Sequence, residues 1–408
     1  MSKKLFEKVK INRVLIILFV LFFCAVFFIP SVVNRDPQIQ TKLLITAIGV
    51  DRTENGETEF SGIAVLPESG EQAKVRSVTV TNVAASLSEC IENVSEQYGK
   101  QVELGLCGLV VFGESTDNES ILPDLEFLLS SALISPGTYL IHTAGNNASE
   151  LLDFASSQNP STAEILSSVV EFNDKTARIT TRTLLEFLSE SHSLSGASVI
   201  PSVRVSEKLG AKESGDEGKG SGEAKSKDSK KSAVQSLTTA VMYKNGKNIG
   251  SLTEEQTLGF NLATSQSDKG LLVIDNLEID GTEMGRIDCW VYSSSFSNQA
   301  VFVNGVPVFG IKIEVILQFQ DQHKIIRAWQ KNGYKEEEVI TPIIKGFEEK
   351  IKSAVLSAYE KAKTVNADIF NVKTEFSRYH CNDYKKIQKT DDVFLLSKPK
   401  VEVKVSFK

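Results

Sequence analysis

Residues 14–29 read VLIILFVLFFCAVFFI, and this run decides where the rest of the chain is placed. Its sixteen residues include no charged or amide side chain. At about 1.5 Å of rise per residue, a helix continued to residue 33 spans roughly 30 Å, the thickness of the hydrocarbon core of a bilayer. The sequence therefore predicts a transmembrane helix over residues 14–33.

The residues on either side of this run predict its orientation. Residues 1–13 carry five basic side chains and one acidic side chain, so this leader is expected in the cytoplasm and the chain after residue 33 outside. No small-x-small cleavage site follows the run, and Cys24 is preceded by Phe22 and Phe23, not by the small residues of a lipoprotein signal. An uncleaved anchor is therefore favoured over a cleaved signal peptide and over an acylated cysteine.

The composition is that of a folded, acidic protein with more than one domain. The 408 residues are 41% hydrophobic and carry a formal net charge of −7. This length exceeds the usual size of a single core, and the acidic balance argues against a nucleic-acid partner. The cysteines show no C-x-x-C spacing, so the sequence does not indicate a metal site with sulfur ligands. The disulfide pairing of the four cysteines after the anchor stays open: Cys90, Cys107, Cys289 and Cys381.

Residues 37–205 are predicted to form an α+β domain. Apolar strands at residues 43–50 and 60–66 flank a polar turn that contains Asn-Gly, which is typical of a hairpin. A helix with an apolar stripe is predicted to follow, capped by Asn82 and ended by Gly99. The other predicted elements are strands at residues 106–113, 139–144 and 198–205, and helices at residues 123–134, 148–155, 163–172 and 183–190.

A polar segment separates this domain from a second, strand-rich one. Residues 206–235 are mostly Lys, Ser, Gly, Glu and Asp, a composition that cannot bury a core, so a disordered charged linker is predicted. Residues 236–335 are predicted to form the second domain. Within it, residues 309–319 read FGIKIEVILQF and alternate apolar with polar side chains from residue 311 on, as in a strand of a sheet with one wet face.

A third domain is predicted over residues 336–408. Its main element is a long amphipathic helix, for which Thr341 is the predicted cap and Pro342 the first helical residue. The chain ends on an alternating strand at residues 401–407. The predicted fold class is thus α+β, with an N-terminal transmembrane helix followed by a three-domain mixed α/β ectodomain.

No motif in the sequence indicates catalysis. P-loop, G-x-S-x-G, H-E-x-x-H and calcium-loop patterns are all missing from the chain. His380 and Cys381 are adjacent, but neighbours on a strand point to opposite faces, so they do not form a dyad there. The other histidines are scattered, and His142 reads as a core or edge residue of a strand. We therefore predict no catalytic, cofactor-binding or metal-binding residue, and no cofactor.

Five short motifs follow one another along the chain. They are AIGVD at residues 47–51, LVVFGE at residues 109–114, residues 139–152, residues 240–252 and ADIF at residues 367–370. Their order resembles the Ger(x)C family of bacterial spore germination proteins, the C subunits of nutrient germinant receptors. The resemblance implies a non-enzymatic subunit at the outer face of the inner spore membrane, beside a membrane-embedded A subunit and a transporter-like B subunit.

The sequence departs from the family pattern in three places. Cys24 lacks a lipobox, Asn371 and Val372 replace glycines, and residues 105–108 read GLCG where a polar segment is usual. Two alternatives stay open, namely a membrane-anchored envelope hydrolase and an ectodomain that itself binds a small nutrient. The aromatic residues Trp290 and Trp329 are the foremost candidates for an interface with a partner.

Overall fold

The computed structural model describes most of the chain after the predicted anchor. The described residues are 41–67, 75–131, 133–158, 176–208, 231–234, 239–275, 277–279, 282–283, 285–319, 333, 335–389 and 391–408. The predicted anchor at residues 14–33 and the predicted helix at residues 163–172 lie outside them. Within the described ranges, no helix is both long enough and apolar enough to cross a membrane.

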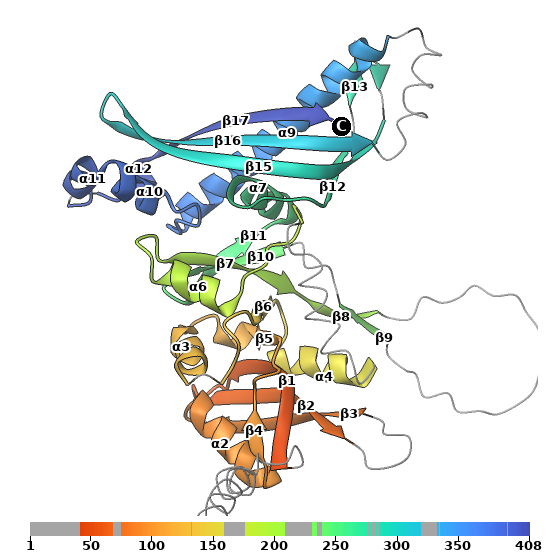
Figure 1. Cartoon of the computed structure of the whole chain (residues 1–408), viewed down its shortest axis with the longest axis vertical. Coiled ribbons are helices and arrows are strands. Elements are labelled where there is room, and N and C mark those ends of the chain that lie inside the picture. Colours follow the sequence, from red (N-terminus) through yellow and green to blue (C-terminus); the bar gives the residue numbers. More distant parts are fainter. Residues whose placement is uncertain are drawn as a thin grey trace, which may run out of the picture.

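A nine-stranded mixed sheet forms the first half of the described chain (Figure 1). Its strands are β1 (Lys42–Arg52), β2 (Thr58–Pro67), β3 (Val75–Ala84), β4 (Gln101–Glu103), β5 (Leu109–Phe112), β6 (Tyr139–Thr143), β7 (Ala197–Val203), β10 (Thr239–Lys244) and β11 (Lys247–Leu252). They run in the order β11-β10-β7-β6-β5-β1-β2-β3, and β4 also pairs with β1. Strands β1, β5, β6 and β7 are parallel, whereas β2, β3, β10 and β11 pair antiparallel.

Helices cover both faces of this sheet. They are α2 (Leu87–Tyr98), α3 (Leu122–Ser130), α4 (Ala148–Gln158) and α6 (Leu184–Ser191). Helix α4 packs on one face, where its residues share a core with Ala47, Leu109 and Ile141. Helices α2, α3 and α6 pack on the other face, in a core that contains Ile48 and Val110. Successive side chains of a strand point to opposite faces of the sheet, so a strand with a continuous apolar run has apolar side chains on both faces.

The predicted hairpin is confirmed, but the helix after it begins later than predicted. Strands β1 and β2 pair antiparallel across the predicted turn. The N-cap of α2 is Ser86, whose side chain accepts from the Glu89 N–H, and not Asn82. Asn82 lies in β3, a strand that was not predicted, although Val78, Thr79, Val80 and Thr81 alternate apolar with polar side chains. The predicted end of the helix at Gly99, which has a left-handed backbone, is confirmed.

A four-stranded sheet forms the second half, in the order β12-β15-β16-β17. Its strands are β12 (Leu271–Ile274), β15 (Ile287–Val303), β16 (Val306–Phe319) and β17 (Lys398–Phe407), and its helices are α7 (Glu254–Thr264), α9 (Glu336–Thr364), α10 (Val372–Tyr379), α11 (Cys381–Ile387) and α12 (Val393–Leu396). The predicted alternation in β16 is confirmed, because Ile311 and Ile313 are buried while Lys312 and Glu314 are exposed. Helices α7 and α9 contact each other and pack on the buried face of this sheet, which carries Ile311 and Ile313 (Figure 1).

The long helix also starts earlier than predicted. Helix α9 begins at Glu336, so Pro342 lies inside it and Thr341 is not its cap. The main-chain N–H of Lys335 donates to Oε2 of Glu338, and the acidic first turn complements the helix dipole. Pro342 has no main-chain N–H, so one hydrogen bond of the helix is missing at this position.

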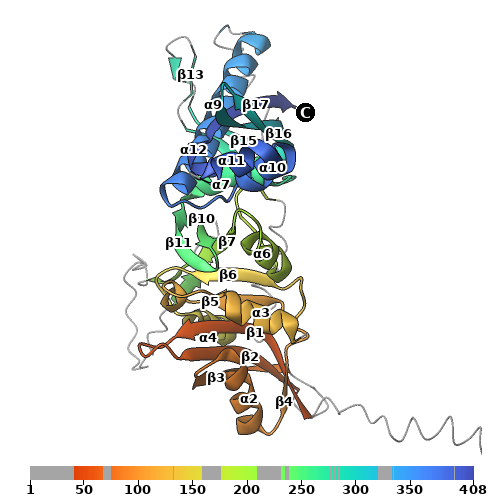
Figure 2. The same ribbon diagram turned by 90° about the vertical axis from the view of Figure 1, so that its left-hand side faces the viewer.

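The sheets do not follow the predicted segment boundaries. Strands β10 and β11, from the predicted second region, belong to the larger sheet through the pairing of β10 with β7. Strand β17, from the predicted third region, pairs with β16. The predicted linker is not structureless at its ends, since β8 (Val205–Lys208) pairs with β9 (Lys231–Val234). The division into three domains stays a prediction, and Figure 2 shows the two sheets following each other along the long axis.

Candidate functional site

The first two sequence motifs meet at the carboxyl ends of β1 and β5. Asp51 is fully buried there. Its Oδ1 accepts hydrogen bonds from the Ala148 N–H at 2.9 Å and the Ser115 hydroxyl at 3.0 Å, and its Oδ2 accepts from the Ser149 N–H at 3.0 Å. Ala148 and Ser149 begin α4, so the Asp51 carboxylate caps that helix and complements its dipole.

The glycines of these motifs leave room for this cap. A Cβ atom at Gly113 would lie 1.7 Å from Oδ1 of Asp51, and one at Gly49 would lie 2.9 Å from Cβ of Ala148. Any side chain at either position would therefore push α4 away from the sheet. The motifs were recognised in the sequence, but their role in joining strand to helix was not, because Asp51 and α4 are far apart along the chain.

Next to this cap lies a half-buried ion cluster. The Arg52 guanidinium bonds Oδ2 of Asp124 at 2.5 Å and Oε2 of Glu119 at 2.9 Å. The side chains of Arg52 and Asp124 are only 10% and 8% exposed. Burial raises the pKa of Asp124 in spite of the attraction of Arg52. Both charges are paired within the chain, so the cluster ties β1 to α3.

A buried histidine links three more elements of the larger sheet. Nδ1 of His142 lies 3.1 Å from the Tyr243 hydroxyl, and its Nε2 lies 3.5 Å from Oδ1 of Asp117. Asn248 also donates to Oδ1 of Asp117 at 2.7 Å. Burial lowers the pKa of His142 to about 4, so the ring is neutral at neutral pH. The prediction that His142 is a core residue is confirmed.

The ADIF motif forms a joint between the two halves. Asp368 is 1% exposed and accepts from the Ser195 hydroxyl at 2.7 Å and from the Val372 and Lys373 N–H groups at 2.8 Å each. Burial raises its pKa. Because Ser195 precedes β7, this carboxylate connects the larger sheet to the start of α10. Lys244 of β10 adds a second link, donating to the Asn366 carbonyl at 2.7 Å.

The sequence predicted His380 and Cys381 on a strand, but the structure places them at the junction of two helices. His380 lies between α10 and α11, where a ring nitrogen is 2.9 Å from the Ala300 carbonyl oxygen. His192 is exposed beside Glu126, and His323 lies outside the described residues. Among the residues that the structure describes, no three His, Cys, Asp or Glu side chains are grouped to hold a metal ion.

The question of disulfide pairing has a simple answer for the described cysteines. Cys90, Cys107 and Cys289 are buried free thiols, and Cys381 is an exposed one. Burial raises the pKa of Cys107 and that of Cys289 to about 12. These buried thiols are therefore protonated and unreactive at neutral pH.

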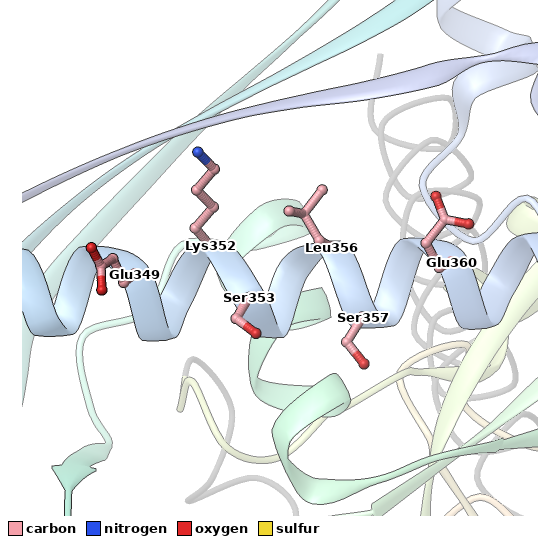
Figure 3. Close-up of a pocket in the computed structure, with 6 residues that line it drawn as sticks. All are labelled: Glu349, Lys352, Ser353, Leu356, Ser357 and Glu360. Atoms are coloured by element: carbon pink, nitrogen blue, oxygen red, sulfur yellow. The ribbon is translucent and has the colours of Figure 1, made fainter. Parts of the chain in front are cut away.

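Two surface hollows lie beside α9. One of about 430 Å³ runs along a single face of α9 (Figure 3). Its lining side chains, among them Lys352, Ser353 and Glu360, diverge from the helix and do not converge on a common point. Another hollow of about 290 Å³ lies between α7, α9 and β12, and it is lined by Glu254, Lys350 and their neighbours.

One exposed aromatic surface lies on the smaller sheet. Trp290 and Tyr292 of β15 are 45% and 47% exposed, and Ile316 on the adjacent strand is 36% exposed. Nζ of Lys408 lies 3.7 Å from the centroid of the Tyr292 ring. We call Trp290, Tyr292 and Ile316 the Trp290 surface. Trp329, the other predicted interface residue, lies outside the described residues.

Comparisons with known proteins identify the family. No curated protein matches the sequence. The chain is similar in fold to the crystal structure of the GerBC protein, with a TM-score of 0.51 and 14% identity over 88% of this chain and 96% of that one. Residues 36–205 match the family model "Spore germination protein N-terminal domain", and residues 238–408 match "Spore germination B3/ GerAC like, C-terminal". The chain therefore belongs to the Ger(x)C family of spore germination proteins.

Proposed function

We propose that this protein is a non-enzymatic C-type subunit of a spore germinant receptor. Residues 14–33 hold it in the inner spore membrane, with the folded part at the outer face, where it supports nutrient-triggered germination. The observation that carries this proposal is the match of residues 36–205 and 238–408 to two successive spore germination family models. Its partners are the membrane-embedded A and B subunits that the family resemblance implies.

The polar clusters support a non-enzymatic role. A general acid or base must reach a substrate atom by a hydrogen bond. Asp51 and Asp368 are buried, and their oxygens accept from main-chain N–H groups and hydroxyls of the same chain. Asp124 is also buried and is paired with Arg52. These carboxylates therefore hold helices and strands in place.

The Trp290 surface is the proposed contact with the partner subunits. Interfaces are enriched in tryptophan and tyrosine, and a few such residues supply most of the binding energy. Trp290 and Tyr292 lie two residues apart on β15 and are about half exposed. Lys408 beside the Tyr292 ring adds a cation to the edge of this aromatic surface.

Germination of variant spores tests this proposal. Spores without the protein should lose the response to a nutrient, and the wild-type chain should restore it. A Trp290→Ser, Tyr292→Ser double variant should restore it poorly at equal membrane abundance. Tyr379→Ser is the matched control, because Tyr379 is 63% exposed on a different element, α10. A full response of the deletion spores to every nutrient tested would contradict the receptor role.

The open alternatives can be tested on the purified chain. Turnover of a glycan or an ester that disappears when one carboxylate is changed would contradict the non-enzymatic part of the proposal. Micromolar binding of an amino acid or sugar in calorimetry would instead support direct recognition of a nutrient by this subunit.

A further inference from the structure

Three apolar residues gather at the amino ends of β5 and β6. Leu106 is 63% exposed in the turn before β5, Leu185 is 53% exposed at the start of α6, and Pro136 is exposed in the turn before β6. We propose that this Leu106 patch rests on the lipid surface of the membrane and fixes the orientation of the folded part. The inference rests on the proposed anchor at residues 14–33.

Hydrogen bonds between the loops place the three residues side by side. The Thr138 hydroxyl donates to the Cys107 carbonyl at 2.9 Å, which joins the turn of Leu106 to the turn of Pro136. The Leu185 N–H donates to the Pro136 carbonyl at 3.1 Å, which joins the same turn to α6. Figure 2 shows α3, α6 and β4 toward the same side of the molecule.

The surroundings of the patch carry little net charge. The exposed tips of the turns are Gly105, Ser135 and Gly137, which have no ionisable side chain. The nearby Lys42 ammonium is paired with the Glu103 carboxylate at 2.8 Å. A surface approaching the apolar boundary of a bilayer must not bury unpaired charge. Glu186, the residue after Leu185, is exposed, and its carboxylate accepts from the Thr183 N–H and hydroxyl at 2.9 Å each. In the proposed orientation this carboxylate therefore stays in the headgroup layer while the apolar residues of the patch reach the boundary.

The predicted anchor keeps this patch within reach of the bilayer. Eight residues, 34–41, connect the anchor to β1, and fully extended they span at most about 28 Å. Gly108, at the end of the Leu106 turn, donates to the Thr46 carbonyl, four residues along β1 from Lys42. Four residues of strand cover about 13 Å. The patch can therefore touch the membrane while the anchor stays inserted.

The shape and composition of the patch favour lipid over a protein partner. Leu106 and Pro136 protrude from turns, and a lipid boundary accepts protruding side chains without a complementary pocket. Protein interfaces are instead enriched in Trp, Tyr and Arg at their centre, as on the Trp290 surface. The two surfaces thus differ in chemistry as well as in position, since the Trp290 surface lies on the smaller sheet.

Depth-dependent fluorescence of the full chain tests the inference. In a Cys24→Ser, Cys381→Ser background the three remaining thiols are buried, so a cysteine placed at Leu106 can be labelled selectively with an environment-sensitive dye. The protein is reconstituted alone into phosphatidylcholine vesicles with or without spin-labelled quencher lipid. The Leu106→Cys label should show blue-shifted emission and lose most of its intensity with the quencher.

A matched control and a second label make the outcome decisive. Leu396→Cys is the control, since Leu396 is 43% exposed on α12 in the other half of the chain, and its label should stay unquenched. Leu185→Cys should be quenched like Leu106→Cys. An unquenched label at both patch positions in protein that floats with the vesicles would overturn the inference alone. Equal quenching at Leu396 would also overturn it, whereas loss of flotation would overturn the anchor and the inference together.

Discussion

Acidification should weaken this protein through one buried side chain, His142. Its imidazole is 2% exposed, and burial lowers its pKa to about 4. In an unfolded chain the pKa of histidine is about 6.5. Between these two values the unfolded chain binds a proton that the folded chain does not. The free energy of unfolding therefore falls as the pH falls from about 6.5 toward 4.

The size of the effect follows from the two pKa values. Preferential protonation of the unfolded chain lowers the free energy of unfolding by about 2 kcal/mol at pH 5 and by about 0.2 kcal/mol at pH 7. A His142→Gln variant lacks this term. It should be less stable than the wild type at pH 7 by about 1–3 kcal/mol, because the Tyr243 hydroxyl loses its partner. The deficit should shrink by about 2 kcal/mol at pH 5.

Urea unfolding at both pH values, followed by circular dichroism, measures this difference. Burial raises the pKa of Asp117, so that group favours folding at low pH, with the opposite sign. It is present in both proteins, and the comparison of wild type with variant removes most of its contribution. A deficit of His142→Gln that is the same at pH 7 and pH 5 would refute the argument from burial.

Three further variants test the packing. Asp51→Asn should cost about 2–4 kcal/mol, because its amide NH₂ would face a main-chain N–H of α4; an unchanged urea midpoint would contradict the cap. Gly259→Val should lower the melting temperature, costing about 1–3 kcal/mol or more, since its Cβ would lie 2.3 Å from the Ala354 carbonyl carbon; a parental melting curve would show that α7 and α9 are not so close. Cys381→Ser should remove one rapidly reacting thiol from the native protein in a colorimetric titration, and an unchanged count would mean that Cys381 is covered.

Much of the secondary structure was predictable because it depends on patterns a few residues long. Alternation of apolar and polar side chains predicted β16, since successive residues of a strand face opposite sides. The Asn-Gly turn predicted the β1–β2 hairpin, and the amphipathic pattern predicted that α9 has a buried face, which includes Phe347 and Ile351. The order of the motifs was enough to indicate the family.

The hydrogen bonds that connect distant segments of the chain could not be predicted from such short patterns. Asp51 and its partner Ala148 are 97 residues apart, and Ser195 and Asp368 are 173 apart, so only the folded sheets bring each pair together. Strand β10 pairs with β7 across residues 206–235, which placed the predicted boundary inside one sheet.

The tertiary structure also decided which apolar side chains are exposed to solvent. Leu106 was predicted to lie in a strand, but it lies in a turn, because the preceding residues 101–103 already pair with β1 as β4. An apolar residue shows in the sequence only that it can be buried, whereas burial itself requires neighbours that the tertiary structure supplies. The sequence alone thus determined many of the elements and the family, and the tertiary structure decided which carboxylates join them and which leucines remain exposed.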